Sequence, residues 1–353
     1  MTTSPPLQTD RAVRRWLIIS AMAVVVAVVV GGITRLTDSG LSITEWRPIS
    51  GIFPPLNSAD WDTAYQRFLQ IPQAQTTHRG ISPESFRWIY WWEWFHRMLA
   101  RLVGVILALP YLVLRLRGAI RTAHRRRLLL LPILAATQGA LGWWMVSSGL
   151  AVRISVSPVR LTIHLGVALV ILCVCIWTML ELTPHDAPPN RRPRSPALRR
   201  GLMAGFTLTF LTLLSGGLVA GLDAGLIYNS FPRMGPNIVP EEYARVTNWW
   251  QAVYQNPVIV QFHHRVLALL TASVLLALAW AARHSAPSLQ RATAVMAGVV
   301  VVQVGLGIAT LLLQVPVVLG VLHQLTGLAV LSATLWAVQR TDSGERGAAE
   351  PRG

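Results

Sequence analysis

The sequence predicts an all-α integral membrane protein, with eight transmembrane helices arranged as two pseudo-twofold-related four-helix bundles. Three observations support this prediction: the composition, eight apolar stretches and an internal repeat. Of the 353 residues, 53% are hydrophobic and only 13% are charged, with a mean hydropathy of +0.47. Soluble domains carry about 25% charged residues, and disordered chains combine low hydrophobicity with high charge. The composition therefore excludes disorder and argues against an ordinary soluble domain.

The eight apolar stretches each contain about 19–22 residues. At 1.5 Å per residue, that length crosses a hydrocarbon core of about 30 Å. The first stretch follows three arginines, as a signal peptide would, but its length and the lack of a cleavage site favour an uncleaved span. The expected spans are Trp16–Thr34, Trp94–Leu114, Leu128–Ser148, Leu161–Leu180, Gly201–Gly221, Phe262–Ala282, Ala292–Leu313 and Val317–Val338.

The arginines predict the orientation of these spans. All 31 basic residues are arginines, and they give the chain a net charge of +16. With the N-terminus placed inside, 19 arginines fall in inner segments, nine fall in the longer outer segments, and three lie within spans. This is the positive-inside pattern of a multi-pass protein of the cell (inner) membrane with both termini cytoplasmic. Because topology explains the charge, we expect no nucleic-acid partner.

The chain also repeats itself, at offsets that shrink from 185 to 159 residues. Because four helices are an even number, the second unit should insert with the same orientation as the first. The pseudo-twofold axis that relates the units should therefore run along the membrane normal. We expect an N-terminal unit over 1–183 with a long outer loop over 35–93, a cytoplasmic linker over 184–200, a C-terminal unit over 201–340 and a tail over 341–353. The matching segments are Gly31-Gly32-Ile33 with Gly216-Gly217-Leu218, Asp38-Ser39-Gly40-Leu41 with Asp223-Ala224-Gly225-Leu226, Phe95-His96-Arg97 with His263-His264-Arg265, Gln138 with Gln303, and His164 with His323.

Four histidines, His96, His164, His264 and His323, occupy the second, fourth, sixth and eighth spans. Each lies near the outer end of its span, so the four imidazoles should share one depth near the outer leaflet. Unrelated polar residues that tie helices together would not recur in this way, and zinc needs three or four ligands in one place. Paired histidines on facing helices are typical of haem iron ligands. We therefore predict two porphyrin sites, pairing His96 with His164 and His264 with His323.

The other histidines and both cysteines are given no role in these sites. Cys173 and Cys175 point to different helix faces, so neither a disulfide nor a metal site is expected from them. His263 points about 100° away from its neighbour His264. The remaining histidines are expected in solvated loops: His78, His124, His185 and His284.

Three arginines depart from the topological pattern because they lie within spans. Arg97 and Arg265 directly follow a predicted iron ligand, and Arg101 lies one turn deeper than Arg97. Porphyrins carry propionates, so these cations are candidate propionate partners. Snorkelling to the outer interface is the alternative for Arg97 and Arg265.

The two units differ at one position beside the histidines. Glu93 lies three residues before His96 and on the same helix face, whereas Gln261 lies three residues before His264. A carboxylate can take or give a proton, so the asymmetry predicts chemistry at the first site and electron transfer at the second. An interfacial ion pair with Arg97 or Arg87 is the alternative for Glu93.

These motifs resemble those of the haem A synthase family, the membrane enzymes that convert haem O to haem A for cytochrome oxidases. The resemblance covers about Trp16 to Val338. The long first outer loop, which lacks a cysteine pair, is similar to the form shared by mitochondria and many proteobacteria. The most specific marks are Gly31-Gly32-Ile33-Thr34-Arg35-Leu36-Thr37, Ser39-Gly40-Leu41-Ser42, Glu93-Trp94-Phe95-His96-Arg97-Met98 and Phe262-His263-His264-Arg265.

The resemblance implies a division of labour between the units. It implies haem b as cofactor on His264 and His323, and the substrate haem O between His96 and His164, with Glu93 essential. It also implies that a ring methyl of haem O is oxidised to an aldehyde by successive hydroxylations, with water as the oxygen source. A haem O synthase and cytochrome oxidase assembly proteins are the expected partners.

Two other functions remain open at this stage. A di-haem cytochrome b would transfer electrons and modify nothing, and it would have no need of a carboxylate in one unit alone. A transporter with parallel repeats would place its polar residues near the membrane midplane instead of at one outer depth.

Overall fold

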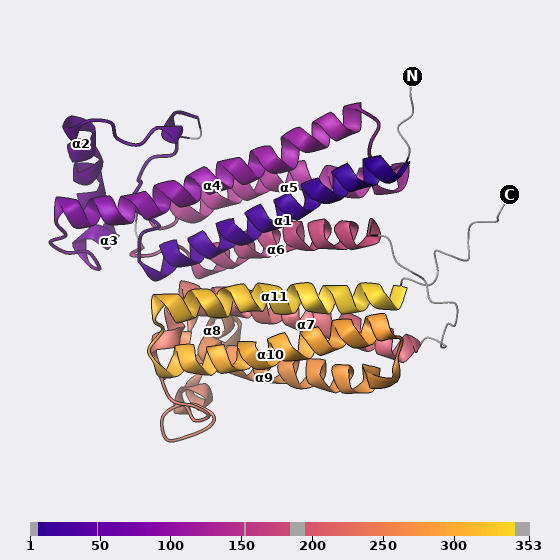
Figure 1. Cartoon of the computed structure of the whole chain (residues 1–353). Coiled ribbons are helices and arrows are strands. Elements are labelled where there is room, and N and C mark those ends of the chain that lie inside the picture. Colours follow the sequence, from indigo (N-terminus) through magenta and orange to yellow (C-terminus); the bar gives the residue numbers. More distant parts are fainter. Residues whose placement is uncertain (1–5, 48, 152, 184–194, 343–353) are drawn as a thin grey trace.

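The computed structural model describes residues 6–47, 49–151, 153–183 and 195–342, and these residues form a bundle of long helices that run side by side (Figure 1). They contain no β-strand, only an isolated bridge between Met234 and Asn237. Eight of the helices are long and apolar enough to cross a membrane, which confirms the all-α, eight-span prediction. These helices are α1 (Pro6–Leu36), α4 (Pro83–Leu116), α5 (Thr122–Ser147), α6 (Pro158–Glu181), α7 (Pro196–Gly221), α9 (Pro257–Ala281), α10 (Pro287–Leu312) and α11 (Val317–Asp342).

Most of these helices extend beyond the apolar stretches, because local signals set their ends. Proline opens α4, α6, α7, α9 and α10, where its missing N–H and fixed φ cost nothing. The side chains of Ser82, Ser195 and Asn256 cap the N–H groups of α4, α7 and α9. As a result α4 begins eleven residues before the expected Trp94, and Glu93 lies inside it instead of at the end of a loop.

Helix contacts follow the same order in the two halves of the chain. In the first half α1 contacts α4 and α6, and α5 contacts the same two helices. In the second half α7 contacts α9 and α11, and α10 contacts the same two helices. The halves meet through α6 with α7, α1 with α11 and α6 with α11. This order is what a twofold relation between α1–α6 and α7–α11 requires, although that relation and the domain limits stay predictions.

Glycines allow the close approach of the two halves. A Cβ on Gly32 of α1 would lie 1.8 Å from Oε1 of Gln324 on α11. A Cβ on Gly217, the matching residue of α7, would lie 3.1 Å from Oγ1 of Thr162 on α6. The second glycine of each repeated Gly-Gly motif is therefore needed where the two halves pack together.

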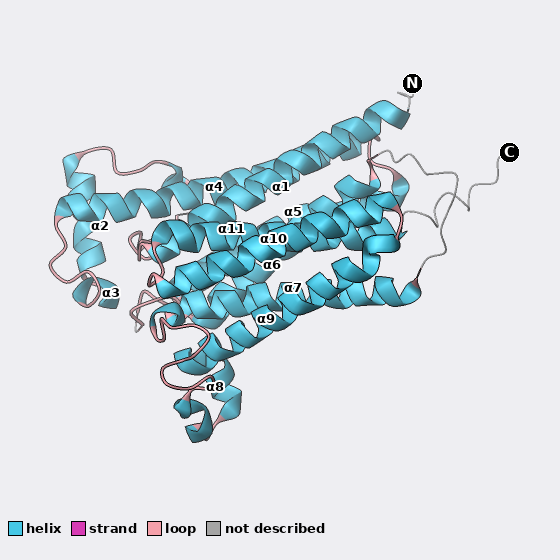
Figure 2. Ribbon diagram, turned by 60° about the horizontal axis from the view of Figure 1, so that its bottom comes forward, coloured by secondary structure: helices cyan, strands magenta, loops and turns pink. Residues whose placement is uncertain are grey.

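The outer segment between α1 and α4 is folded instead of being one long loop. It contains α2 (Ser58–Leu69) and α3 (Pro72–Gln75), which lie beyond the outer ends of the spans (Figures 1 and 2). Phe68 and Ile71 pack there against Phe86 on the first turns of α4. In the second half the corresponding region holds only short helices, including η2 (Ala224–Leu226), η3 (Glu241–Arg245) and α8 (Trp249–Gln255).

The start of α1 and the end of α11 lie at the same end of the bundle (Figure 1). This arrangement agrees with an even number of spans, while the cytoplasmic side stays a prediction. Part of the expected linker, 184–194, lies outside the described residues, and its last residues belong to α7. In the same way, α11 continues to Asp342 and the rest of the expected tail lies outside the described residues.

The expectation of a solvated loop was wrong for His124. This residue lies in the first turn of α5 and is buried, with Nδ1 3.5 Å from Glu181 Oε2, which Arg127 also contacts at 2.6 Å. His78 is half-buried and contacts the carbonyl oxygen of Asp38 at 3.1 Å. His284 is exposed in η4 (Ala282–His284), as expected, and His185 lies outside the described residues.

Candidate functional site

Each of the four predicted ligand histidines packs against a glycine of a neighbouring helix. A Cβ on the glycine would lie 2.8 to 3.3 Å from the Cε1 atom of the imidazole, so a larger residue would push the ring aside. The first glycine of each Gly-Gly motif contacts the histidine of the second or sixth span. A glycine of α5 or α10 contacts the histidine of the fourth or eighth span. The pairs are Gly31 with His96, Gly142 with His164, Gly216 with His264, and Gly307 with His323.

The histidines are distributed as one pair in each unit. His96 on α4 and His164 on α6 belong to the first unit, and His264 on α9 and His323 on α11 belong to the second. In each unit the two helices that carry the histidines are separated by the two helices that carry the glycines. Two imidazoles therefore face the inside of each four-helix unit, which suits a flat group with two axial positions.

The hydrogen bonds of the rings differ between the units. Ser215 lies 2.7 Å from His264 Nδ1, which orients the ring and leaves Nε2 for a ligand. The residue that matches Ser215 in the repeat is Val30, which has no hydroxyl to offer His96. On α5, Gln138 donates to the carbonyl oxygen of His164 at 3.0 Å and also lies 3.3 Å from Nε2 of that ring.

Glu93 is 2% exposed and is enclosed by the segment that follows α1. Its Oε2 accepts hydrogen bonds of 2.8 Å from the Ser42 hydroxyl and from the backbone N–H of Ile43. Its Oε1 pairs with Arg97, at 2.5 Å from Nη2 and 3.0 Å from Nε. An ionised carboxylate can accept all of these bonds. The pairing with Arg97, one of the two alternatives from the sequence, is thus present in the structure.

Arg97 also fixes the outer segment above the first site. Its guanidinium donates to the carbonyl oxygens of Ile43 at 2.7 Å and Glu45 at 3.0 Å. In the second unit Arg265 donates to Tyr228 at 2.6 Å and Ser230 at 2.9 Å. Both pairs of acceptors are related by the 185-residue offset of the repeat, so the two arginines perform the same structural task.

The side chain beside Arg265 is a neutral amide with fewer hydrogen bonds than the carboxylate beside Arg97. Gln261 is 2% exposed, and its amide donates to the Tyr228 carbonyl at 3.1 Å. The residue that matches Ser42 is Ile227, so no hydroxyl reaches the amide from that position. The Tyr228 phenol donates to Glu242 at 2.9 Å, and this hydrogen bond raises the pKa of Tyr228.

The sequence identified these arginines but not their partners. Arg101 donates to the Arg47 carbonyl at 3.0 Å. Contact of Arg97, Arg101 or Arg265 with propionates stays a prediction. From the sequence, Ser42 was named only within a family motif and Ser215 was not named, although aligning the repeats position by position shows both as polar residues opposite apolar ones.

Arg35, near the end of α1, joins the two units, a role that was not predicted from the sequence. Its guanidinium lies 3.1 Å from Asp38 and 2.7 Å from Asp223. These two aspartates match in the repeat, and both have a positive φ, of 50° and 51°. One arginine therefore holds both turns that follow the Gly-Gly helices.

The residues of the second unit fit an axial haem ligand pair. A glycine stands against each ring, and Ser215 holds Nδ1 of His264. Among the described residues, no group of three or more His, Cys, Asp or Glu side chains could hold a metal ion, so these residues form no metal site with three or more such ligands.

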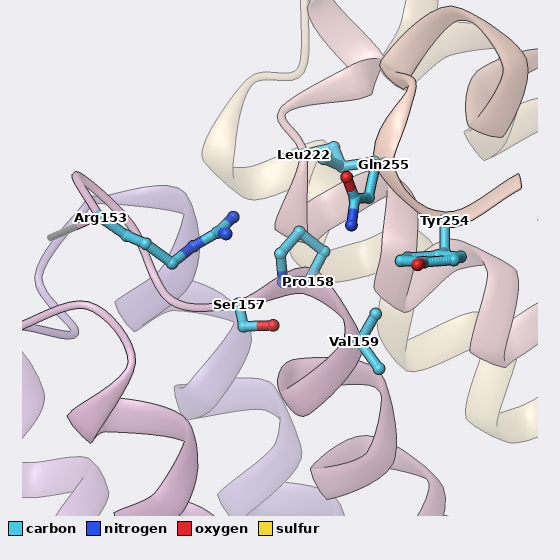
Figure 3. A pocket seen from close by; sticks show the side chains of 7 residues that line it. All are labelled: Arg153, Ser157, Pro158, Val159, Leu222, Tyr254 and Gln255. Carbon is cyan, nitrogen blue, oxygen red and sulfur yellow. The ribbon is translucent and has the colours of Figure 1, made fainter. Parts of the chain in front are cut away.

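A hollow of about 150 Å³ lies between residues of the two units, apart from the histidines (Figure 3). Its lining residues are Arg153, Ser157, Pro158, Val159, Leu222, Tyr254 and Gln255.

Comparison with known proteins places the chain in a family. The model of a cytochrome oxidase assembly protein family, COX15-CtaA, matches residues 14–335. A protein named heme A synthase from Sinorhizobium fredii (strain NBRC 101917 / NGR234) is 46% identical over 91% of this chain and 87% of its own length. Proteins of the same name from Maricaulis maris (strain MCS10) and Bradyrhizobium sp. (strain ORS 278) are 41% and 42% identical. These matches cover 94% and 96% of this chain, and 97% and 94% of the relatives. The chain belongs to the cytochrome oxidase assembly protein family, as a multi-pass membrane protein.

Proposed function

We propose that this chain is a haem A synthase, an oxidoreductase that converts a ring methyl of haem O to an aldehyde. Relatives that cover nearly the whole chain carry the name heme A synthase. The paired histidines of each unit supply ligands of the type that haem iron takes. The arginine distribution supports a place in the cell membrane with both termini cytoplasmic.

The first unit binds the substrate in this proposal. His96 and His164 hold the iron of haem O, and Glu93 acts on the reacting methyl group. Oxidation of a methyl to an aldehyde with water as the oxygen source releases four protons and four electrons. Glu93 either accepts a proton or stabilises positive charge that develops on the methyl carbon. Arg97 and Ser42 keep its carboxylate in one orientation.

The second unit holds haem b on His264 and His323 in this proposal. When bound, haem b supplies one-electron redox chemistry, which a hydroxylation that releases electrons needs. Ser215 orients His264 for this role. The electrons then leave to an acceptor outside the chain.

One observation carries the assignment of the two roles, namely the difference between Glu93 and Gln261. Both side chains are buried at matching positions next to an arginine that fixes the outer segment. Only Glu93 carries a carboxyl group that can take or give a proton, because the side chain of Gln261 is an amide. A protein that only transferred electrons between two haems would need no such difference.

The test is the variant Glu93→Gln, which places the amide of the second unit into the first. Membranes of cells that make haem O are extracted, and haem A is separated from haem O by chromatography. We expect haem A formation to fall at least about 100-fold, the usual size of a general acid–base contribution, with the haem b spectrum of the purified protein unchanged. A normal haem A yield would overturn the catalytic role of Glu93.

Two other outcomes would point to the alternatives. Two haems that always co-purify, with no haem A in the extracts, would favour a di-haem cytochrome b. A purified protein without Soret absorption would favour a transporter.

A haem O synthase is the expected source of the insoluble substrate, and proteins of cytochrome oxidase assembly are the expected consumers of the product.

A further inference from the structure

The segment that follows α1 carries an apolar patch on its surface. We define the patch by five residues: Trp46, Ile49, Ile52, Phe53 and Leu56. Ile49, Phe53 and Leu56 are 81%, 71% and 75% exposed, so they are almost as open as in an extended chain. Several large apolar side chains that are exposed together in one short segment mark a place where a protein meets another apolar phase. The patch lies in a connecting segment, where polar side chains would be expected if it faced water.

A contact with α4 gives the depth of this segment. Arg101 Nη2 donates to the Arg47 carbonyl at 3.0 Å, and the same nitrogen lies 3.0 Å from where a Cβ on Gly51 would be. Arg101 lies fourteen residues before Arg115 at the inner end of α4, which is about 21 Å along a helix. A hydrocarbon core of about 30 Å then places Arg101, and the segment that it holds, below the outer boundary of the membrane.

A second contact, to α5, agrees with this depth. The rings of Trp46 and Trp143 lie 6.2 Å apart, and both are about half exposed. Trp143 lies sixteen residues after Arg127, or about 24 Å, which is the level at which tryptophans gather near a membrane interface. In Figures 1 and 2 the part of this segment that leads into α2 lies on the side of α4 that faces away from the helices of the second unit.

Two polar groups of the segment that would resist burial in lipid have protein partners. The carbonyl of Arg47 accepts from Arg101, and the guanidinium of Arg47 pairs with Glu45 at 2.8 Å. Unpaired backbone and charged groups are the main cost of placing irregular chain in a bilayer. The contacts with Arg101 and Glu45 therefore lower the free-energy cost of placing this segment in the bilayer.

We propose that the apolar patch is seated in the outer leaflet of the bilayer, where its partner is the acyl chains of the lipids. It then covers the lipid-facing side of α4 next to Arg101, one turn from the Arg97 that holds Glu93. The placement does not depend on the proposed reaction, because it follows from the depth of Arg101 and the exposure of the five side chains.

The experiment measures where residue 53 lies relative to lipid. The variant Phe53→Cys is spin-labelled and reconstituted into liposomes, and its collisions with oxygen, which concentrates in lipid, are compared with those of a water-soluble nickel chelate. Leu112→Cys, on the exposed face of α4, is the lipid control, and Thr63→Cys, exposed on α2, is the water control. The protein without a new cysteine corrects for labelling of Cys173 and Cys175.

We expect the label at Phe53→Cys to resemble that at Leu112→Cys, with oxygen collisions favoured over nickel collisions. A label that resembles Thr63→Cys would overturn the proposal. A protein partner as the natural occupant would give this second result, because the purified protein would then leave the patch in water. All three changes are at exposed side chains, so loss of the fold is not expected, and a thermal melt checks each variant.

Discussion

The first and second four-helix units surround different polar groups with the same frame. In both, a glycine stands against each histidine, and an arginine after the first histidine holds two carbonyls of the segment that precedes its helix. Inside that frame the first unit places Glu93 with the hydroxyl of Ser42, where the second places Gln261 with Ile227. A duplicated framework can thus diverge by exchanging only the buried polar pair.

Beside the histidines the difference is reversed, because there the second unit has the hydroxyl and the first has an apolar side chain. In the second unit Ser215 fixes the ring of His264, whereas Val30 stands at the matching position beside His96. A partner on Nδ1 strengthens an axial ligand and fixes its orientation. Under the proposed function, the unit with the oriented ligand keeps its haem, and the unit with the carboxylate binds a haem that must leave after the reaction.

The largest expected effect separates the histidines of the two units. His264→Ala should abolish the resident haem b spectrum, because one axial ligand is lost. His96→Ala should retain that spectrum and lose haem A formation. Difference spectra of the purified variants and pigment analysis of the membranes measure both. Equal loss of the spectrum in the two variants would refute the division of roles.

A smaller effect is expected from the hydroxyl on Glu93. Ser42→Ala removes a 2.8 Å hydrogen bond to a buried carboxylate, worth about 1.5–3 kcal/mol, so haem A formation should fall about 10- to 100-fold. The matched change in the second unit, Ile227→Ala, should leave the rate near normal. The rate of haem A formation in membranes distinguishes them. Equal rates in Ser42→Ala and the unchanged protein would show that Arg97 and Ile43 orient Glu93 without help.

The smallest effect should come from Ser215→Ala. Loss of a partner to a metal-ligating histidine weakens metal affinity about 10-fold or more, so haem b should dissociate faster while the spectrum keeps its shape. Transfer of haem from the purified protein to an excess of apomyoglobin measures the rate. Ser332→Ala on α11, whose hydroxyl donates only to the Leu328 carbonyl within its own helix, is the control. The two variants should differ, and identical rates would remove the role of Ser215.

Much of the fold could be predicted from the sequence. The apolar stretches, the repeat and the arginines predicted eight spans, because in a membrane every backbone group must be satisfied within a helix or a closed barrel. The helix ends were less well predicted, since Pro83 and its cap continue α4 into water, where hydropathy gives no signal. The same limit hid α2, whose aromatic side chains pack against the first turns of α4.

The sequence alone determined which residue types the two units contain and where they repeat. The spacing of histidines, glycines and arginines along a helix can be read directly from the order of residues in the chain. Only the tertiary structure decided which partners those side chains meet. The pairing of Glu93 with Ser42, of Ser215 with His264, and of Arg35 with Asp223 joins residues that lie far apart in sequence. Such contacts depend on how helices rotate and approach, which side-chain packing sets and periodicity does not encode.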